Sequence, residues 1–166
     1  MYALKHQEIN MKRLFVLLGA LICAPAWSGE NVYQKTIDAS MDETYKRVYE
    51  QLEENRFFIV FEPNIGKNLS GFAERWGEDY NHNGLTGIRS MVFCNGWYAN
   101  AVSNADPSML ALCPLHITLI EKDSMTTVLF SRPTVIAAGS PAAEIVTEIE
   151  SKVINALEKA LVKPVK

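Results

Sequence analysis

Two cysteines in the middle of the chain, Cys94 and Cys113, are the residues best suited to chemistry. Eighteen residues separate them, so they do not form the CxxC motif of thiol oxidoreductases. In an oxidising compartment they predict a structural disulfide, worth about 3 kcal/mol for a loop of roughly 20 residues. A reactive thiol pair is one alternative, although no Lys, Arg or His lies directly beside either cysteine to lower its pKa. Unpaired buried thiols are the other alternative.

A histidine follows the second cysteine closely and raises the question of a metal site. Cys94, Cys113 and His116 together would supply ligands for copper or zinc. Neither His82 nor His116 belongs to the HxH or HxxxH spacing that is typical of metal sites. We therefore expect no resident metal and keep these three residues as an alternative. The sequence also contains no P-loop, dinucleotide fingerprint or nucleophile elbow, so no organic cofactor is expected.

Aromatic residues gather around an Asn-Gly pair that precedes a predicted helix. Aromatic rings commonly line ligand pockets, and the first backbone N–H groups of a helix can bind an anion. We expect the following residues to bound a ligand-binding or partner-binding site: Trp76, Asn95, Gly96, Trp97 and Tyr98. The alternatives are core and rim packing for the aromatic rings, and an ordinary turn for the Asn-Gly pair.

No arrangement of residues specifies catalysis. An acidic cluster at Glu74, Glu78 and Asp79 has no serine, histidine or second carboxylate placed with it by a motif, and a solvated charged face accounts for it. We assign no catalytic residue and expect binding rather than enzymatic activity. The prediction is a non-enzymatic module that binds a ligand or a partner. The alternatives are a thiol-redox or sulfur-handling protein and a carrier of copper or zinc.

The first 28 residues resemble a cleavable signal peptide. A cationic start at residues 11–13 precedes an apolar run over residues 14–23, and small residues follow at the spacing of a cleavage site. The apolar run is shorter than the roughly 20 residues that span a bilayer, although an uncleaved anchor remains the alternative. Cleavage fits after Ala26 or after Ser28, and Met11 is a candidate initiator. We expect a periplasmic or secreted protein that leaves the membrane once the signal is removed.

Residues 29–166 have the length of one domain, enough for a single packed core. The full chain has 16 basic and 19 acidic residues. Residues 1–26 hold three of the basic and one of the acidic residues, which leaves 13 basic and 18 acidic residues and a net charge of −5. This balance excludes a nucleic-acid-binding protein, which needs a basic surface. A small molecule or another periplasmic protein is the expected partner.

Hydrophobic periodicity predicts nine elements in the order strand, helix, strand, helix, strand, helix, strand, strand, helix. The predicted strands are 32–37, 57–61 (buried), 88–93, 115–120 and 126–130, with a hairpin loop at 121–124. The predicted helices begin at Ser40, Asn68, Trp97 and Ser140. Ser40 and Glu43 form a capping box, and Trp97, Ala101 and Ala105 are expected on one side of the third helix. The fold class is α+β, with a mainly antiparallel sheet and helices packed mainly on one face.

Short motifs in the middle of the chain resemble the domain-of-unknown-function 302 family. They are Phe93-Cys94-Asn95-Gly96, Ala101, Asp106-Pro107, Cys113-Pro114-Leu115-His116-Ile117 and Arg132-Pro133. The resemblance covers residues 57–137 well and the flanking helices loosely. Gly96 stands where the family usually has proline, and Cys113 stands where leucine is common. The resemblance implies an α+β fold of the TATA-binding-protein-like type and carries no settled activity.

Overall fold

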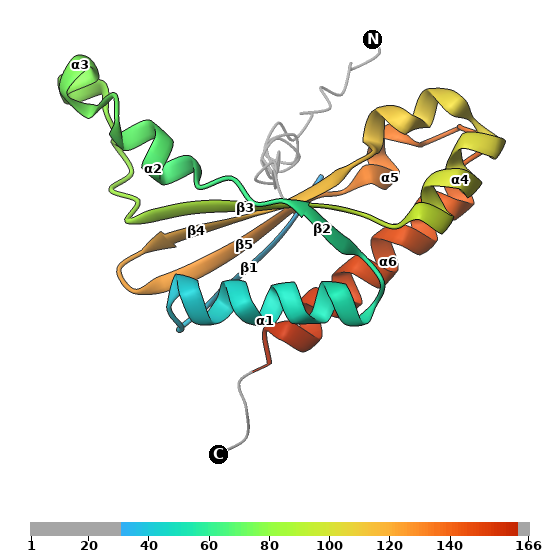
Figure 1. Ribbon diagram of the computed structural model, residues 1–166, viewed down its shortest axis with the longest axis horizontal. Helices are drawn as coiled ribbons and strands as arrows, with labels where there is room; N and C mark the ends of the chain where they lie inside the picture. Colours follow the sequence, from blue (N-terminus) through green and yellow to red (C-terminus); the bar gives the residue numbers. More distant parts are fainter. Residues whose placement is uncertain (1–30, 163–166) are drawn as a thin grey trace, which may run out of the picture.

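The computed structural model describes residues 31–162 as a five-stranded antiparallel sheet with helices packed against it (Figure 1). The strands are β1 (Val32–Ile37), β2 (Phe58–Phe61), β3 (Gly87–Cys94), β4 (Leu115–Lys122) and β5 (Met125–Ser131). They lie in the order β1-β5-β4-β3-β2 across the sheet. The α+β class and the antiparallel sheet expected from the sequence are confirmed. The predicted signal peptide, residues 1–28, lies outside the described residues.

Eight helical segments accompany the sheet within residues 31–162. They are α1 (Met41–Glu54), α2 (Ile65–Ser70), α3 (Ala73–Trp76), α4 (Gly96–Ala105), α5 (Pro133–Ile136), α6 (Ala143–Ala160), and two 3₁₀ helices, η2 (Gly77–Asp79) and η3 (Pro107–Leu112). The sequence did not predict the short segments η3 and α5. None of the helices described between residues 31 and 162 combines the length and apolar character needed to cross a membrane.

The core lies between one face of the sheet and the two long helices, α1 and α6, which also contact each other (Figure 1). Side chains alternate between the two faces of a strand, and the inward residues of β4 and β5 are almost completely buried. These residues are Ile117, Leu119, Val128 and Phe130. Each long helix buries one apolar face in this core, which includes Val48 and Leu52 in α1 and Val153 and Leu157 in α6.

The start of α1 shows the Ser40 half of the predicted capping box. The Ser40 side chain accepts a hydrogen bond from the Glu43 backbone N–H at 3.3 Å. The start of α6 differs from the prediction, because residues 140–142 form a turn before the helix begins at Ala143. Ser140 holds this turn through its hydroxyl, which accepts from Ala142 N–H and donates to Asp106.

The strand predicted as buried, residues 57–61, is an edge strand instead. β2 pairs only with β3, and its side chains Phe58, Val60 and Phe61 are each more than half exposed. An edge strand has one neighbour, so its position in the sheet overrides its apolar composition. Phe57, which precedes the strand, is the residue of this run that enters the core.

The second predicted helix is divided into two short ones. Asn64, rather than Asn68, caps the first of them by accepting a hydrogen bond from Lys67 N–H at 2.9 Å. α2 ends at Gly71, and α3 follows after it. Gly66 allows α2 to lie directly on β3, since a Cβ atom there would be 3.0 Å from the Ile88 nitrogen.

The side that α4 buries lies one residue along from the side that holds Trp97, Ala101 and Ala105. In α4 the buried residues are Tyr98 and Val102, whereas Trp97 is 68% exposed. The predicted hairpin loop is also shorter, because Lys122 pairs with Met125 and only Asp123 and Ser124 form the turn. Both turn residues have positive φ, as a two-residue type I′ hairpin requires.

Candidate functional site

Cys94 and Cys113 lie side by side at one end of the sheet. Cys94 ends β3, Cys113 directly follows η3, and their Sγ atoms share a hydrogen bond at 3.4 Å and are not joined in a disulfide. Burial raises the pKa of the Cys113 thiol to about 11, and hydrogen bonding and charge interaction with Cys94 add to the shift. A thiol with this pKa stays protonated at neutral pH and is a weak nucleophile. The disulfide stays a prediction. The short distance between the two Sγ atoms makes its formation geometrically accessible.

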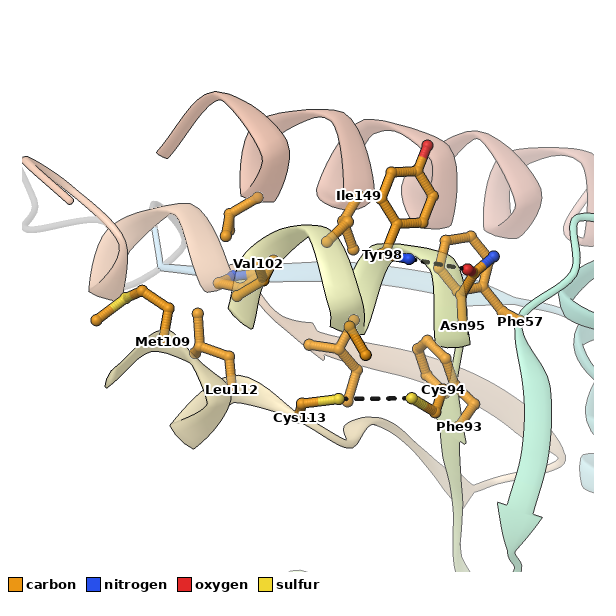
Figure 2. A pocket seen from close by; sticks show the side chains of 14 residues that line it. Phe57, Phe93, Cys94, Asn95, Tyr98, Val102, Met109, Leu112, Cys113 and Ile149 are labelled. Atoms are coloured by element: carbon orange, nitrogen blue, oxygen red, sulfur yellow. Dashed lines mark hydrogen bonds between the residues drawn. The ribbon is translucent and has the colours of Figure 1, made fainter. Parts of the chain in front are cut away.

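A small apolar pocket adjoins the two thiols (Figure 2). Its volume is about 40 Å³, far below the roughly 300–1,000 Å³ that is typical of ligand sites. Carbon atoms form most of its wall, which includes Phe57, Phe93, Val102, Leu112 and Ile149. Asn95 and Tyr98, two of the predicted ligand-binding residues, also line it. We refer to this cavity as the thiol pocket.

Asn95 uses its side chain on the protein backbone. Its Oδ1 accepts hydrogen bonds from the N–H groups of Trp97 at 3.0 Å and Tyr98 at 3.1 Å, so it caps α4. Its Nδ2 donates to the carbonyl oxygen of Arg56 at 3.0 Å. The backbone N–H groups that were expected to face an anion are therefore satisfied by the cap itself. The neighbouring Gly96 has open space where a Cβ atom would lie, so no close approach requires glycine there.

Tyr98 and Trp97 also have positions that the fold explains. The Tyr98 hydroxyl donates to Glu148 at 2.6 Å, and its ring stacks on Phe57 with 6.1 Å between ring centroids. Burial, followed by the hydrogen bond to Glu148, raises the pKa of Tyr98 to about 12. Trp97 makes an edge contact with Tyr98 and lines neither this pocket nor the cleft described next.

Trp76 is not grouped with the other predicted site residues. It lines a cleft beside Gly87 and Arg89, where β3 begins, whereas Asn95 follows the opposite end of the same eight-residue strand. The expectation of one site containing Trp76, Asn95 and Tyr98 is corrected accordingly. The cause is topological, because α2 and α3 lead into β3 and α4 leaves it.

The cleft that contains Trp76 is much larger than the thiol pocket, at about 690 Å³. Residues 64–86, here called the arm, hold α2, α3 and η2 and project from one end of the sheet (Figure 1). The cleft lies between the arm, the start of α1 and the start of β3, and we call it the arm cleft. Side chains that line it include Lys67, Leu69, Trp76, Tyr80, Arg89 and Glu121.

Arg89 is held in a fixed orientation at the arm cleft. Its guanidinium lies over the Tyr45 ring, 3.6 Å from the ring centroid, and its Nη1 donates to Asp42 Oδ1 at 3.0 Å. The Tyr45 hydroxyl donates in turn to Glu62 at 2.7 Å. Burial, followed by this hydrogen bond to Glu62, raises the pKa of Tyr45. Tyr45 therefore remains a neutral, well-placed support for the guanidinium at physiological pH.

Three hydrogen-bond donors at the arm cleft, unlike Arg89, have no partner in the described part of the chain. The Lys67 ammonium, the Trp76 indole N–H and the Tyr80 hydroxyl make no hydrogen bond or ion pair with any residue between 31 and 162. The sequence prediction included Trp76 but missed Lys67, Tyr80 and Arg89. The sequence did hold one signal for Arg89. It is a charged residue on the same inward-facing side of an apolar strand as Met91 and Phe93.

The alternative metal site is not assembled. Residues 31–162 contain no group of three or more His, Cys, Asp or Glu side chains that could hold a metal ion. Cys94 and Cys113 are therefore not joined by His116 as a third ligand. His116 is exposed on β4, where its Cα position pairs with that of Val92.

Comparison with known proteins gives the family and the fold. The family model described as "Domain of unknown function DUF302" matches residues 33–160. The chain belongs to the DUF302 family. It is also similar to the crystal structure of an uncharacterized conserved DUF302 protein from Bacillus stearothermophilus, with a TM-score of 0.68 and 21% sequence identity. That match covers 79% of this chain and 98% of the other, and at this identity it concerns the fold alone.

The family membership predicted from the motifs around Cys94 and Cys113 is thus confirmed. No curated protein matches the chain significantly. DUF302 membership describes the domain and assigns it no reaction, so the function has to be argued from the geometry of the two cavities.

Proposed function

We propose that this DUF302 protein is an exported, non-enzymatic binding module whose small-molecule ligand occupies the arm cleft. One observation carries the proposal: a cleft of about 690 Å³ is lined by an aromatic side chain and by donors that have no partner in residues 31–162. Its volume lies within the range of about 300–1,000 Å³ that is typical of ligand sites. Trp76, one of the residues selected from the sequence, would form part of its wall.

The thiol pocket supports a ligand-binding role less well. Its volume is only about 40 Å³, and the polar side chains of Asn95 and Tyr98 are already bonded to the protein. The distance of 3.4 Å between Cys94 and Cys113 favours a thiol-based function as the second candidate. The raised pKa of Cys113 opposes catalysis by that residue, because reactive cysteines generally have lowered pKa values.

We assign the two cysteines a structural role within this proposal. In the periplasm or outside the cell they would form the disulfide that their compartment predicts. The proposed export rests on the signal-like pattern of residues 1–28. A copper or zinc carrier is the weakest alternative, since no third ligand accompanies the two thiols within residues 31–162.

The test is an NMR screen of the isotopically labelled protein against a library of small aromatic and aliphatic fragments. We expect bound fragments to shift the signals of Lys67, Trp76, Tyr80 and Arg89 together. Trp76→Ala should weaken the best fragment by about tenfold, because it removes a large aromatic contact. Trp97→Ala is the matched control, since Trp97 is an exposed tryptophan outside the cleft, and it should leave the affinity unchanged.

Two results would contradict the proposal. One is a set of shifts confined to the thiol pocket, which would move the binding site to Cys94 and Cys113. The other is the absence of any fragment that shifts the arm-cleft residues at millimolar concentration. An equal loss of affinity in Trp76→Ala and Trp97→Ala would show that the contact with Trp76 is not specific.

A further inference from the structure

The fold brings two cationic side chains to the arm cleft from distant parts of the sequence. Gly66 of α2 lies so close to β3 that a Cβ atom would be 3.0 Å from Ile88 N and 3.5 Å from Ile88 O. The residues that follow these two contact points are Lys67 and Arg89, and both line the cleft. The packing of α2 on β3 therefore places both residues at the same cavity.

Of the three carboxylates that line the cleft, Glu121 is held by the protein through both oxygens, whereas Asp42 and Asp79 are each more than 90% exposed. Glu121 accepts from Met41 N–H at 2.8 Å through Oε1 and from the Thr86 hydroxyl at 3.0 Å through Oε2. Asp42 accepts from Arg89 through Oδ1. Asp79 is 93% exposed, and its nearest cationic partner is His82 at 3.9 Å. The acids thus either bond inward or extend into solvent.

Several donors at the cleft remain available to a ligand. Arg89 uses one guanidinium nitrogen, Nη1, in its ion pair with Asp42, and a guanidinium has five N–H donors. The Lys67 ammonium and the Tyr80 hydroxyl have no partner within residues 31–162. A ligand that satisfies these groups has to supply acceptors, and a carboxylate supplies the strongest ones among ordinary organic groups.

The wall beside these donors is flat and apolar. The Trp76 ring stacks on the Phe72 ring, with 5.1 Å between centroids and 19° between planes. The Tyr80 ring also contacts Trp76, with 6.5 Å between their ring centroids. Leu69 and Ile88 add aliphatic surface to the lining. The stack with Phe72 limits the motion of the indole, so it offers a fixed surface to a planar group.

We infer that the arm cleft takes an organic anion in which a carboxylate is attached to a flat apolar body. The carboxylate lies between Lys67 and Arg89, and the flat body lies against Trp76. This inference rests on the proposed function, because it names the class of ligand for the same cleft. It requires that charge and planarity of the ligand each contribute to affinity.

Three probes of one shape test the class: indole-3-acetate, its neutral isostere indole-3-acetamide, and the cation tryptamine. Each is titrated into the labelled protein and followed by NMR at low ionic strength. We expect the acetate to bind about tenfold more tightly than the acetamide and tryptamine to bind most weakly. The preference should decrease when salt is added, because both cations are accessible to solvent.

The matched variants are Lys67→Gln and Lys122→Gln. Both remove one positive charge from an exposed lysine with no partner within residues 31–162, but only Lys67 lines the cleft. Lys67→Gln should reduce the affinity for the acetate by about tenfold and leave that for the acetamide unchanged. Lys122→Gln should leave both affinities close to those of the wild type.

Each contrary result has a separate meaning. Equal binding of acetate and acetamide, or an equal loss in the two lysine variants, would overturn the assignment of an anion while the cleft remained a binding site. Absence of shifts with all three probes would overturn the assignment of a flat anionic ligand. The fragment screen with Trp76→Ala then decides independently whether the cleft binds a small molecule at all.

Discussion

At the scale of single residues, the number of free hydrogen-bonding positions distinguishes Asn95, which the fold uses, from Lys67, for which we propose a ligand. An asparagine amide can make four hydrogen bonds, and Asn95 already makes three of them with the backbone. The Lys67 ammonium makes none within residues 31–162. The sequence indicated that Asn95 stands at a strand-to-helix junction, but its bond to Arg56 depends on a turn 39 residues earlier. The first feature is local and predictable, whereas the second is a tertiary contact.

Replacement of Asn95 by alanine tests this structural role. Asn95→Ala removes the cap of α4 and the bond to Arg56, so we expect the free energy of unfolding to fall by about 1–2 kcal/mol. Asn68→Ala is the control, because Asn68 is exposed in α2 and its side chain caps nothing. It should change stability by less than about 0.5 kcal/mol. Urea unfolding measures both values, and equal effects of the two variants would contradict the capping role.

At the scale of elements, sequence patterns predicted features that depend on adjacent residues. They failed for features that depend on which elements pack side by side in the fold. β1 was predicted at its observed bounds, and α1 began at its capping box, because alternation and capping are properties of adjacent residues. The run at residues 57–61 looked buried because it is wholly apolar, but strand order places β2 at an edge. The arm cleft could not be predicted, since it depends on α2 packing against β3 and on the start of α1 lining the same cavity.

The prediction at the scale of elements concerns the segment between β3 and β4, which contains α4 and η3. α4 and η3 leave the sheet after Cys94 and return at Cys113, so a bond between the two sulfurs would close this segment on itself. Each thiol would lose one proton and one electron to a disulfide oxidant. We expect the oxidised protein to be more stable than the reduced protein by about 3 kcal/mol. The double variant Cys94→Ser/Cys113→Ser should match the reduced form.

The intact mass of the protein, with and without reductant and alkylator, measures this bond directly. The untreated protein should be lighter than the reduced protein by two hydrogens and should resist alkylation. Its mass also reports whether processing follows Ala26 or Ser28. Two free thiols in protein purified without reductant would contradict the disulfide, and an uncleaved N-terminus would contradict the proposed processing.

At the scale of the whole molecule, acidic residues of α6 join parts of the fold that are distant in sequence. Glu148 accepts from Tyr98 of α4, and Glu158 accepts from Tyr33 and pairs with Lys35 of β1. Glu150, which is nearly buried, binds Arg132 and Thr134. The apolar stripe of α6 was readable from the sequence, but these polar contacts were not, because their partners lie on three different elements. The helix is thus a common attachment for β1, α4 and the start of α5.

Glu150 makes the stability of this assembly depend on pH. Burial opposes its ionisation, but hydrogen bonds from Thr134 and the ion pair with Arg132 outweigh that effect and lower the pKa of Glu150. The folded state therefore binds the proton less readily than the unfolded chain, in which a glutamate has a pKa of about 4.3. The resulting stabilisation is fully present above that value and is lost as the pH falls through the lower pKa of the folded state.

Glu150→Gln should remove this contribution, because the neutral amide loses the ion pair with Arg132 and weakens the bonds from Thr134. We expect a loss of about 2–3 kcal/mol in the free energy of unfolding at pH 7. The difference from wild type should shrink as the pH falls from the unfolded-state value of about 4.3 through the lowered pKa of the folded state, since the wild-type carboxylate becomes protonated over that range. Glu144→Gln, an exposed position in the first turn of α6, should show little change at either pH. Urea unfolding across this pH range decides the matter, and a difference for Glu150→Gln that stays constant with pH would show that packing rather than charge gives Glu150 its role.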